Sequence, residues 1–96
     1  MKLPNEVLKK RDNILRIAKR HGAGNIRVFG SMARGEADDK SDLDLLVEMR
    51  EGSSFLDHAA LWLELQEIFT RKVDVVSENG IKDRIRDRVL REAVPL

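Results

Sequence analysis

The sequence predicts a small α/β or α+β fold in which a short β-sheet is flanked by helices. Segments with apolar residues at helical spacing alternate with short apolar runs, in the order helix, strand, short helix, strand, helix, strand, helix. The chain has 96 residues, near the lower limit for a self-sufficient core, so we expect residues 1–96 to form a single domain. We also expect helices to cover one face of the sheet and to leave the other face for a functional site.

The N-terminal part of the chain predicts a helix, a strand and a short helix. Apolar residues at helical spacing run from Pro4 to about Arg20, and residues 21–24 end this first helix. Residues 26–29, Ile-Arg-Val-Phe, are typical of a strand. Ser31 is well placed to cap a short helix after this strand, because its side chain can accept a hydrogen bond from a free backbone N–H group.

The rest of the chain predicts two strands, each followed by a helix. Leu43–Met49 forms the second strand and Val73–Val76 the third, and the long helix between them allows a crossover connection and adjacent strands. That helix begins after Ser54, with Asp57 completing an imperfect capping box. We expect its Trp62 to pack in the core, with a partner contact or an adenine stack as the alternatives. The apolar positions that mark this helix are Phe55, Ala59, Leu63 and Phe69. Those of the last helix are Ile81, Ile85, Val89 and Ala93.

Three aspartates are the strongest candidates for a catalytic metal site. Asp42 and Asp44 point to the same face of a strand. Two carboxylates at such a short distance repel each other unless a cation lies between them. Mg²⁺ is the natural cation, with Mn²⁺ as an alternative, because it prefers oxygen ligands. Two such ions roughly 3.5–4 Å apart could activate an attacking hydroxyl and stabilise the leaving oxygen. Asp74 would complete the site, as a metal ligand and as a general base, if its strand lies beside the first.

A glycine-serine pair precedes these aspartates and is the candidate phosphate site. Glycine at position 30 lets a phosphate approach the backbone closely, and Ser31 begins a helix whose free N–H groups attract anions. A triphosphate should therefore lie over Gly30 and Ser31. Arg34 could add positive charge near the β- and γ-phosphates, and we rank it above Lys40 for this role.

Each of these features has an ordinary explanation when it stands alone. An Asp-x-Asp pair can be a surface pair or a fragment of a calcium loop, a Gly-Ser pair can be a simple turn, and Asp74 can be a charge on an edge strand. Their combination favours the metal site: a strand, Gly-Ser, a polar loop, Ser-Asp-x-Asp leading into a second strand, and a later apolar-Asp-apolar strand.

The same residues carry a family resemblance. Gly-Ser-x-Ala-Arg-Gly from Gly30, followed by Ser-Asp-x-Asp-Leu from Ser41, resembles the signature of the DNA polymerase beta-like nucleotidyltransferase superfamily. Within it, the chain is most similar to the minimal nucleotidyltransferase (MNT) domain proteins of prokaryotes. The resemblance extends to Asp74 and to the closing stretch Glu92–Leu96. It implies the nucleotidyltransferase fold with a mixed sheet.

The resemblance also implies a specific activity. MNT proteins are antitoxins of HEPN-domain ribonuclease toxins, and they transfer AMP from ATP to a tyrosine of the toxin with release of pyrophosphate. The small size of the chain supports a dedicated protein target, because there is no room for a further domain that would grip another acceptor. Two alternatives stay open. The chain could be a non-catalytic antitoxin that binds its toxin, or a nucleotidyltransferase for a small molecule or an RNA end that a partner subunit completes.

Composition excludes several other classes. The chain has no cysteine and only two histidines, which argues against disulfides and against thiolate or histidine zinc sites. No apolar run approaches the roughly 20 residues that span a membrane, and no signal-peptide pattern is present, so we expect a cytoplasmic protein.

The charges are unevenly distributed, although the net charge is only +1. Residues 1–40 hold ten Lys/Arg against five Asp/Glu, residues 41–80 hold three against nine, and residues 81–96 hold five against three. This gives no strong nucleic-acid signal. Arg84, Arg88 and Arg91 share one face of the last helix. Solvation with pairing to Asp87 is the ordinary explanation for that face, and an acidic partner or nucleotide phosphates are the alternatives.

Overall fold

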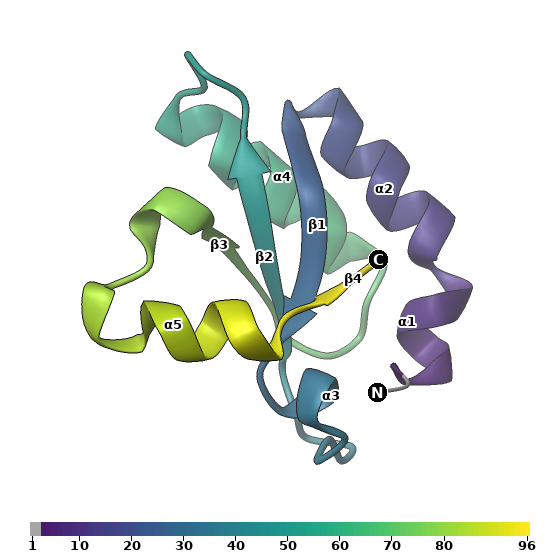
Figure 1. The fold of residues 1–96 in the computed structure, drawn as a ribbon. Helices are drawn as coiled ribbons and strands as arrows, with labels where there is room; N and C mark the ends of the chain where they lie inside the picture. The colour runs from purple at the N-terminus through teal and green to yellow at the C-terminus, as the bar shows by residue number, and fades with distance from the viewer. Residues whose placement is uncertain (1–2) are drawn as a thin grey trace.

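The computed structural model describes residues 3–96 and contains a four-stranded mixed sheet (Figure 1). The strands are β1 (Ala23–Phe29), β2 (Leu43–Met49), β3 (Val73–Ser77) and β4 (Val94–Pro95), in the spatial order β3-β2-β1-β4. β1 runs antiparallel to β2 and β4, whereas β2 and β3 are parallel. The expected fold class and the mixed sheet are confirmed, and the second and third strands, whose adjacency the sequence allowed but did not settle, are neighbours. The two-residue strand β4 was not predicted.

Within residues 3–96, five α-helices and one 3₁₀-helix connect or flank these strands. They are α1 (Asn5–Lys9), α2 (Arg11–Arg20), α3 (Ser31–Arg34), α4 (Phe55–Glu67), η1 (Glu78–Gly80) and α5 (Asp83–Glu92). The prediction of one continuous first helix is wrong, because Lys10 interrupts it with φ −102° and ψ 8°. The interruption coincides with a tertiary contact that periodicity does not report. The Lys10 ammonium donates to the Ile68 carbonyl and lies 5.1 Å from the centre of the Phe69 ring.

The sheet is covered on both faces. Alternate residues of β2, Leu43, Leu45 and Val47, are buried in the main core beneath α2 and α4. Leu46 points the other way, into a second apolar cluster with Ile81 and Val89. Figure 1 shows α5 crossing in front of the sheet and α4 behind it. The expectation that only one face is covered is therefore wrong, because the apolar stripe of α5 is buried on the face that also carries the aspartates.

Helix α4 begins as predicted but buries a different face. Ser54 is its N-cap, and its side chain and that of Asp57 form a complete capping box. The positions buried against the sheet are Leu61 and Leu65, whereas Phe55 is 83% exposed. Leu63 is also exposed, and Phe69 is buried beyond the end of the helix. The two apolar positions Phe55 and Leu63 thus mark the helix but not its buried side.

The expectation that Trp62 packs in the core is wrong. The residue is 38% exposed, and its Nε1–H donates to the carbonyl oxygen of Val73 at 2.7 Å. His58 Nε2 lies 2.8 Å from the carbonyl oxygen of Val75 on the same strand. Because β3 is at the edge of the sheet, these two α4 side chains occupy backbone groups that would otherwise be free to pair with another chain.

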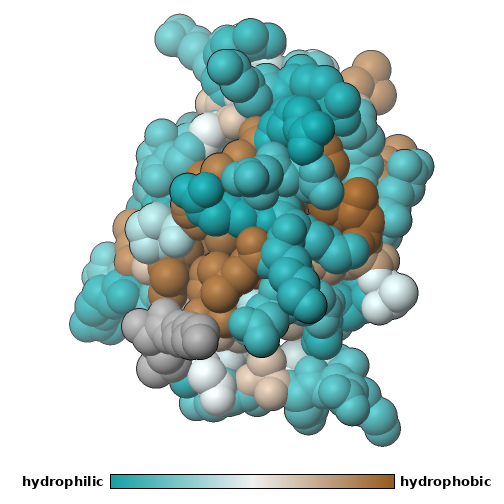
Figure 2. Space-filling view, turned by 90° about the vertical axis from the view of Figure 1, so that its right-hand side faces the viewer, coloured by the Kyte–Doolittle hydropathy of each residue, from teal (hydrophilic) through white to brown (hydrophobic). Residues whose placement is uncertain are grey.

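The side of the molecule with α1, α2 and the C-terminus shows apolar surface between hydrophilic side chains (Figure 2). A hollow of about 420 Å³ lies there between α2, β1 and the end of the chain. Its lining residues are Leu15, Lys19, Ala23, Gly24, Asn25, Ile26, Pro95 and Leu96. Among the helices of residues 3–96, none has the length and apolar character needed to cross a membrane.

Candidate active site

The parallel pairing of β2 and β3 brings two of the three aspartates side by side. Asp44 lies directly opposite Asp74 in the register of these strands. Residues paired in neighbouring strands project to the same face, so both carboxylates lie on the face of the sheet crossed by α5. Asp42 immediately precedes β2 and is two residues before Asp44. The sequence left open whether the strand of Asp74 lies beside that of Asp44, and the pairing of β2 with β3 aligns the two residues.

The electrostatic environment of Asp44 favours a cation. Burial, together with the nearby negative charges of Asp74 and Asp42, raises the pKa of this carboxyl from 3.8 to about 6, and Arg34 opposes part of the shift. Lys72 offers only a distant countercharge, with its Nζ 3.9 Å from Oδ1 of Asp74 and its side chain 65% exposed. Asp44 is therefore a half-buried carboxylate with little compensating positive charge.

The backbone of Gly30 lies very close to the side chain of Asp44. This backbone has φ 77° and ψ −155°, and a Cβ atom at this position would lie 2.3 Å from Oδ2 of Asp44. A residue with a side chain would be strained and would collide with the carboxylate. The expectation that Ser31 caps the short helix is wrong, because Gly30 occupies the N-cap position and Ser31 is the first helical residue. No side chain caps this short helix, and the carbonyl oxygen of Gly30 accepts the N–H groups of Ala33 and Arg34, each at 3.1 Å.

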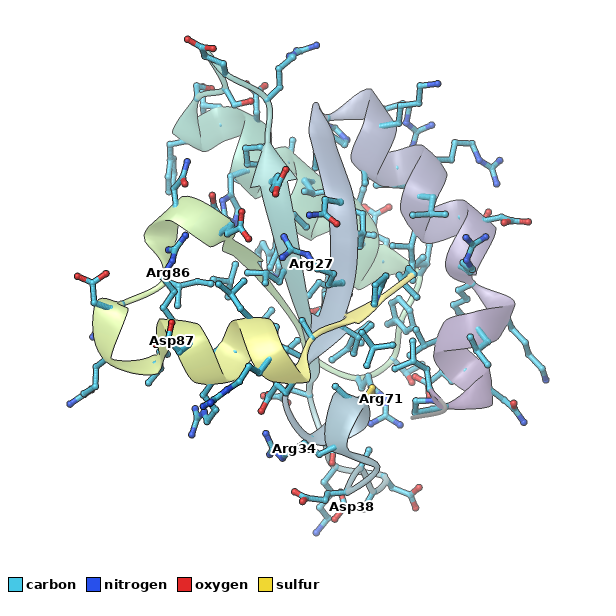
Figure 3. All side chains as sticks on the ribbon, viewed as in Figure 1. Arg27, Arg34, Asp38, Arg71, Arg86 and Asp87 are labelled. Carbon is cyan, nitrogen blue, oxygen red and sulfur yellow. The ribbon has the colours of Figure 1, made fainter. Side chains whose placement is uncertain are left out.

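Arg34, the predicted phosphate ligand, lies beside this glycine turn. Figure 3 shows it between α3 and the C-terminal end of α5. Its Nε donates to Oε1 of Glu36 at 3.0 Å, and its Nη1 lies 3.2 Å from each carboxylate oxygen of Glu92. Oε2 of Glu92 also accepts the N–H of Gly30 at 2.6 Å. Lys40, the lower-ranked candidate for phosphate binding, lies on the exposed 35–42 loop, where its backbone N–H donates to the Asp38 side chain.

Two residues that sequence reasoning did not single out shape the site. Glu92 was noted only within the closing stretch of the chain, and Arg71 was not noted. Arg71 donates to both oxygens of Glu6 and to the carbonyl oxygens of Asp38 and Ser41 (Figure 3). It therefore holds the loop that leads into Asp42. These contacts join residues 30 to 65 positions apart, so no local pattern could have indicated them.

The donor set fits a magnesium ion. Asp44 and Asp74 supply adjacent oxygen ligands, and Mg²⁺ is usually held by one or two carboxylates together with substrate phosphates. Within residues 3–96, no group of three His, Cys, Asp or Glu side chains is arranged to hold a metal ion. A three-carboxylate cage is thus not preformed there, and metal binding by Asp42, Asp44 and Asp74 stays a prediction.

The sequence matches the family model described as the nucleotidyltransferase domain over residues 11–96. The chain belongs to the nucleotidyltransferase domain family. The matched range includes the glycine turn, all three aspartates and Glu92. This nucleotidyltransferase is 43% identical over 90 residues to the Methanocaldococcus jannaschii protein MJ0435, provisionally named a protein adenylyltransferase, with 94% of each chain covered. It is 40% identical over 78 residues to the protein adenylyltransferase MntA of Thermococcus cleftensis, with 81% of this chain and 79% of MntA covered.

Solved structures agree with this family membership. A structure provisionally described as a minimal nucleotidyltransferase superposes with a TM-score of 0.85 at 51% identity, covering 96% of this chain and 94% of the other. A toxin–antitoxin structure with AMP-PNP superposes with a TM-score of 0.74 at 19% identity, covering 88% of this nucleotidyltransferase and 69% of that chain. The second likeness shows a shared fold. The resemblance to nucleotidyltransferases seen in the sequence is therefore confirmed.

Proposed function

We propose that this nucleotidyltransferase is a Mg²⁺-dependent protein adenylyltransferase that transfers AMP from ATP to a tyrosine hydroxyl of a cognate HEPN ribonuclease toxin and so acts as its antitoxin. The observation that carries the proposal is the register of Asp44 with Asp74 beneath the Gly30 turn. It sets two carboxylates and a close backbone approach at one place, as transfer of a nucleotidyl group requires. Both partners of such a reaction would be found in the cytoplasm, where we place the chain.

The residues of the site have separate roles in this reaction. Asp42 and Asp44 would hold the metal ion, while Gly30 and Ser31 would pack against the phosphates and Arg34 would bind them. Bound Mg²⁺ neutralises charge on the phosphates and on the leaving pyrophosphate.

The transfer step itself conserves atoms and charge. The tyrosine oxygen attacks the α-phosphorus and forms the new P–O bond, while the bond from that phosphorus to the bridging oxygen of the β-phosphate breaks. Pyrophosphate leaves with that bridging oxygen. Asp74 accepts the proton of the tyrosine hydroxyl as general base, and it is the third candidate ligand for the metal.

The protein acceptor is supported by the relatives. MntA, 40% identical to this chain, is named a protein adenylyltransferase, and MJ0435 has the same provisional name. Two solved structures with this fold are described as toxin–antitoxin structures, and one of them contains AMP-PNP. These names support a toxin as acceptor and a nucleoside triphosphate as donor.

The test combines the purified chain, Mg²⁺, ATP labelled at the α-phosphate and the protein encoded by the adjacent gene. We expect label on that protein, loss of its ribonuclease activity, and no label when Mg²⁺ is chelated or Asp44→Asn is used. Asp12→Asn is the matched control, because Asp12 lies on α2 with its side chain 92% exposed. Tight association with no label would indicate a non-catalytic antitoxin. Label only on tRNA or a small molecule would indicate another acceptor, and either result contradicts the proposal.

A further inference from the structure

We propose that Glu92, the last residue of α5, is a positioning residue that sets the Gly30 turn and the Arg34 guanidinium for the phosphates of the nucleotide. The inference rests on the proposed function, because it concerns nucleotide binding at the same site. It assigns a role to an acidic side chain that lies beside a phosphate site, where a negative charge would by itself repel the ligand.

Glu92 makes one short, partly buried contact with Gly30 and two longer, solvent-exposed contacts with Arg34. Its carboxylate accepts the N–H of Gly30 at 2.6 Å and lies 3.2 Å from Nη1 of Arg34 through both oxygens. The Glu92 side chain is only 14% exposed. Hydrogen bonds in which one or both partners are charged are shorter and stronger than neutral ones. The Glu92 carboxylate therefore contacts both the Gly30 turn, which lies against Asp44, and Arg34, the last residue of α3.

Arg34 is held from two sides, which leaves part of its guanidinium available. Glu36 takes the Nε–H and Glu92 takes Nη1. None of the hydrogen bonds and ion pairs found within residues 3–96 uses Nη2 of Arg34. A guanidinium has five donors in a rigid plane, so fixing two edges orients the third. The Arg34 side chain is 42% exposed, so a phosphate can reach that edge.

The C-terminal part of the chain fixes Glu92 in this place. Val89, one turn earlier on α5, is buried against Leu46 on the sheet. Two residues after Glu92, Val94 pairs with Val28 in the β4–β1 ladder. Glu92 is thus anchored on both sides along the chain, and its reach to Gly30 follows from the docking of α5 and β4. This is what a positioning residue needs, because its own backbone must not move when the ligand binds.

The opposite hypothesis is that Glu92 occupies the phosphate site and must leave before a triphosphate can bind. The two hypotheses predict opposite signs for one substitution. Glu92→Gln keeps an oxygen that can accept the Gly30 N–H but removes the charge that holds Arg34. If Glu92 positions Arg34, the substitution weakens nucleotide binding. If Glu92 competes with the phosphates, it strengthens binding.

The test measures the Kd for AMP-PNP with Mg²⁺ by calorimetry and kcat and KM for ATP in the transfer assay. For Glu92→Gln we expect a rise in Kd and KM of about tenfold, as for loss of one charge-assisted hydrogen bond, with a much smaller change in kcat. Glu92→Asp keeps the charge and should restore part of the affinity. Glu67→Gln, an exposed substitution on α4, should leave Kd unchanged.

A double-mutant comparison separates positioning from a general structural role. In an Arg34→Ala background, Glu92→Gln should change Kd little further, because its effect acts through Arg34. An unchanged or lower Kd for Glu92→Gln, or full additivity with Arg34→Ala, would overturn the inference. If Glu92→Gln does not fold, Glu92→Asp decides: an affinity equal to that of the wild type overturns it as well. Failure of the wild-type chain to bind AMP-PNP would instead count against the proposed function itself.

Discussion

Replacement of Gly30 by alanine tests the geometry on which the site depends. The glycine backbone has φ 77° and ψ −155°, a conformation almost restricted to glycine. The added Cβ would lie 2.3 Å from Oδ2 and 3.3 Å from Cγ of Asp44. The Asp44 side chain or the turn must therefore move, and either movement separates the glycine turn from the carboxylate that we expect to bind metal.

The expected loss of stability has two parts. Holding a non-glycine residue in this backbone region costs about 1–3 kcal/mol. Overpacking against a neighbouring group adds typically 1–3 kcal/mol. The two parts sum to about 2–6 kcal/mol, and about 3 kcal/mol already corresponds to a fall in Tm of roughly 12–24 °C for a domain of this size. Nucleotide binding should be lost in the folded fraction, since the displaced carboxylate no longer faces Asp74.

The assay is thermal and urea unfolding followed by circular dichroism, with AMP-PNP titration at a temperature where the variant is folded. Gly80→Ala is the matched control, because a Cβ there has no atom within 4 Å and the glycine has no positive φ. Combining Gly30→Ala with Asp44→Ala should recover the collision part but not the backbone part of the loss. A Tm for Gly30→Ala within about 2 °C of the wild type, where a change of 1 kcal/mol already moves Tm by more, would refute this reasoning.

Three further predictions follow from the charges and caps of the fold. In EDTA at pH 7.5, Asp44→Asn should stabilise the protein by about 1–2 kcal/mol, after allowance for solvent screening of a half-buried group. The pKa of Asp44 is raised from 3.8 to about 6, so its ionisation destabilises the folded wild type fully above pH 6 and no longer does so below about pH 4. If Asp44→Asn raised the free energy of unfolding equally at pH 4 and at pH 7.5 in urea melts, this prediction would be contradicted. The hydrogen bond from Arg71 lowers the pKa of Glu6 below its usual 4.5, so the stability it adds is present at neutral pH and is lost as the pH falls through the folded-state pKa. Glu6→Gln should cost at most about 1 kcal/mol at pH 7, and a cost that persists at pH 2.5 would exclude this origin. Ser54→Ala should lower the free energy of unfolding by about 1 kcal/mol through loss of the capping box with Asp57, measured by urea unfolding, and no loss would show that the box contributes nothing.

Local patterns predicted the elements that depend on neighbouring residues. The bounds of the second strand, Leu43–Met49, agree with β2, and the Ser54–Asp57 capping box is present. All four apolar positions predicted for the last helix are buried or partly buried, although only Ile85 and Val89 lie within α5, with Ile81 before it and Ala93 after it. Strand alternation, helix caps and four-residue spacing are short-range properties, so the sequence contains the information for them directly.

Patterns failed where burial depended on distant elements. Phe55 and Leu63 have helical spacing yet are exposed, while Leu61 and Leu65 face the sheet. Trp62 covers the edge strand instead of entering the core. Periodicity says which residues share a face of α4, but the side that meets the sheet is set by how the crossover connection docks. The same limit explains why burial of α5 on the aspartate face was missed.

The chemistry of the candidate site was readable from the chain because its residue types and spacings are local: a glycine-serine turn, two aspartates one residue apart, and a third in a later strand. The tertiary structure alone decided three features of the site. They are the alignment of Asp44 with Asp74, the close approach of Gly30 to Asp44, and the hydrogen bonds of Glu92 to Gly30 and Arg34. Glu92 lies 62 residues from Gly30 along the chain. Contacts of that separation form only when strand register and helix docking have set the distances between elements.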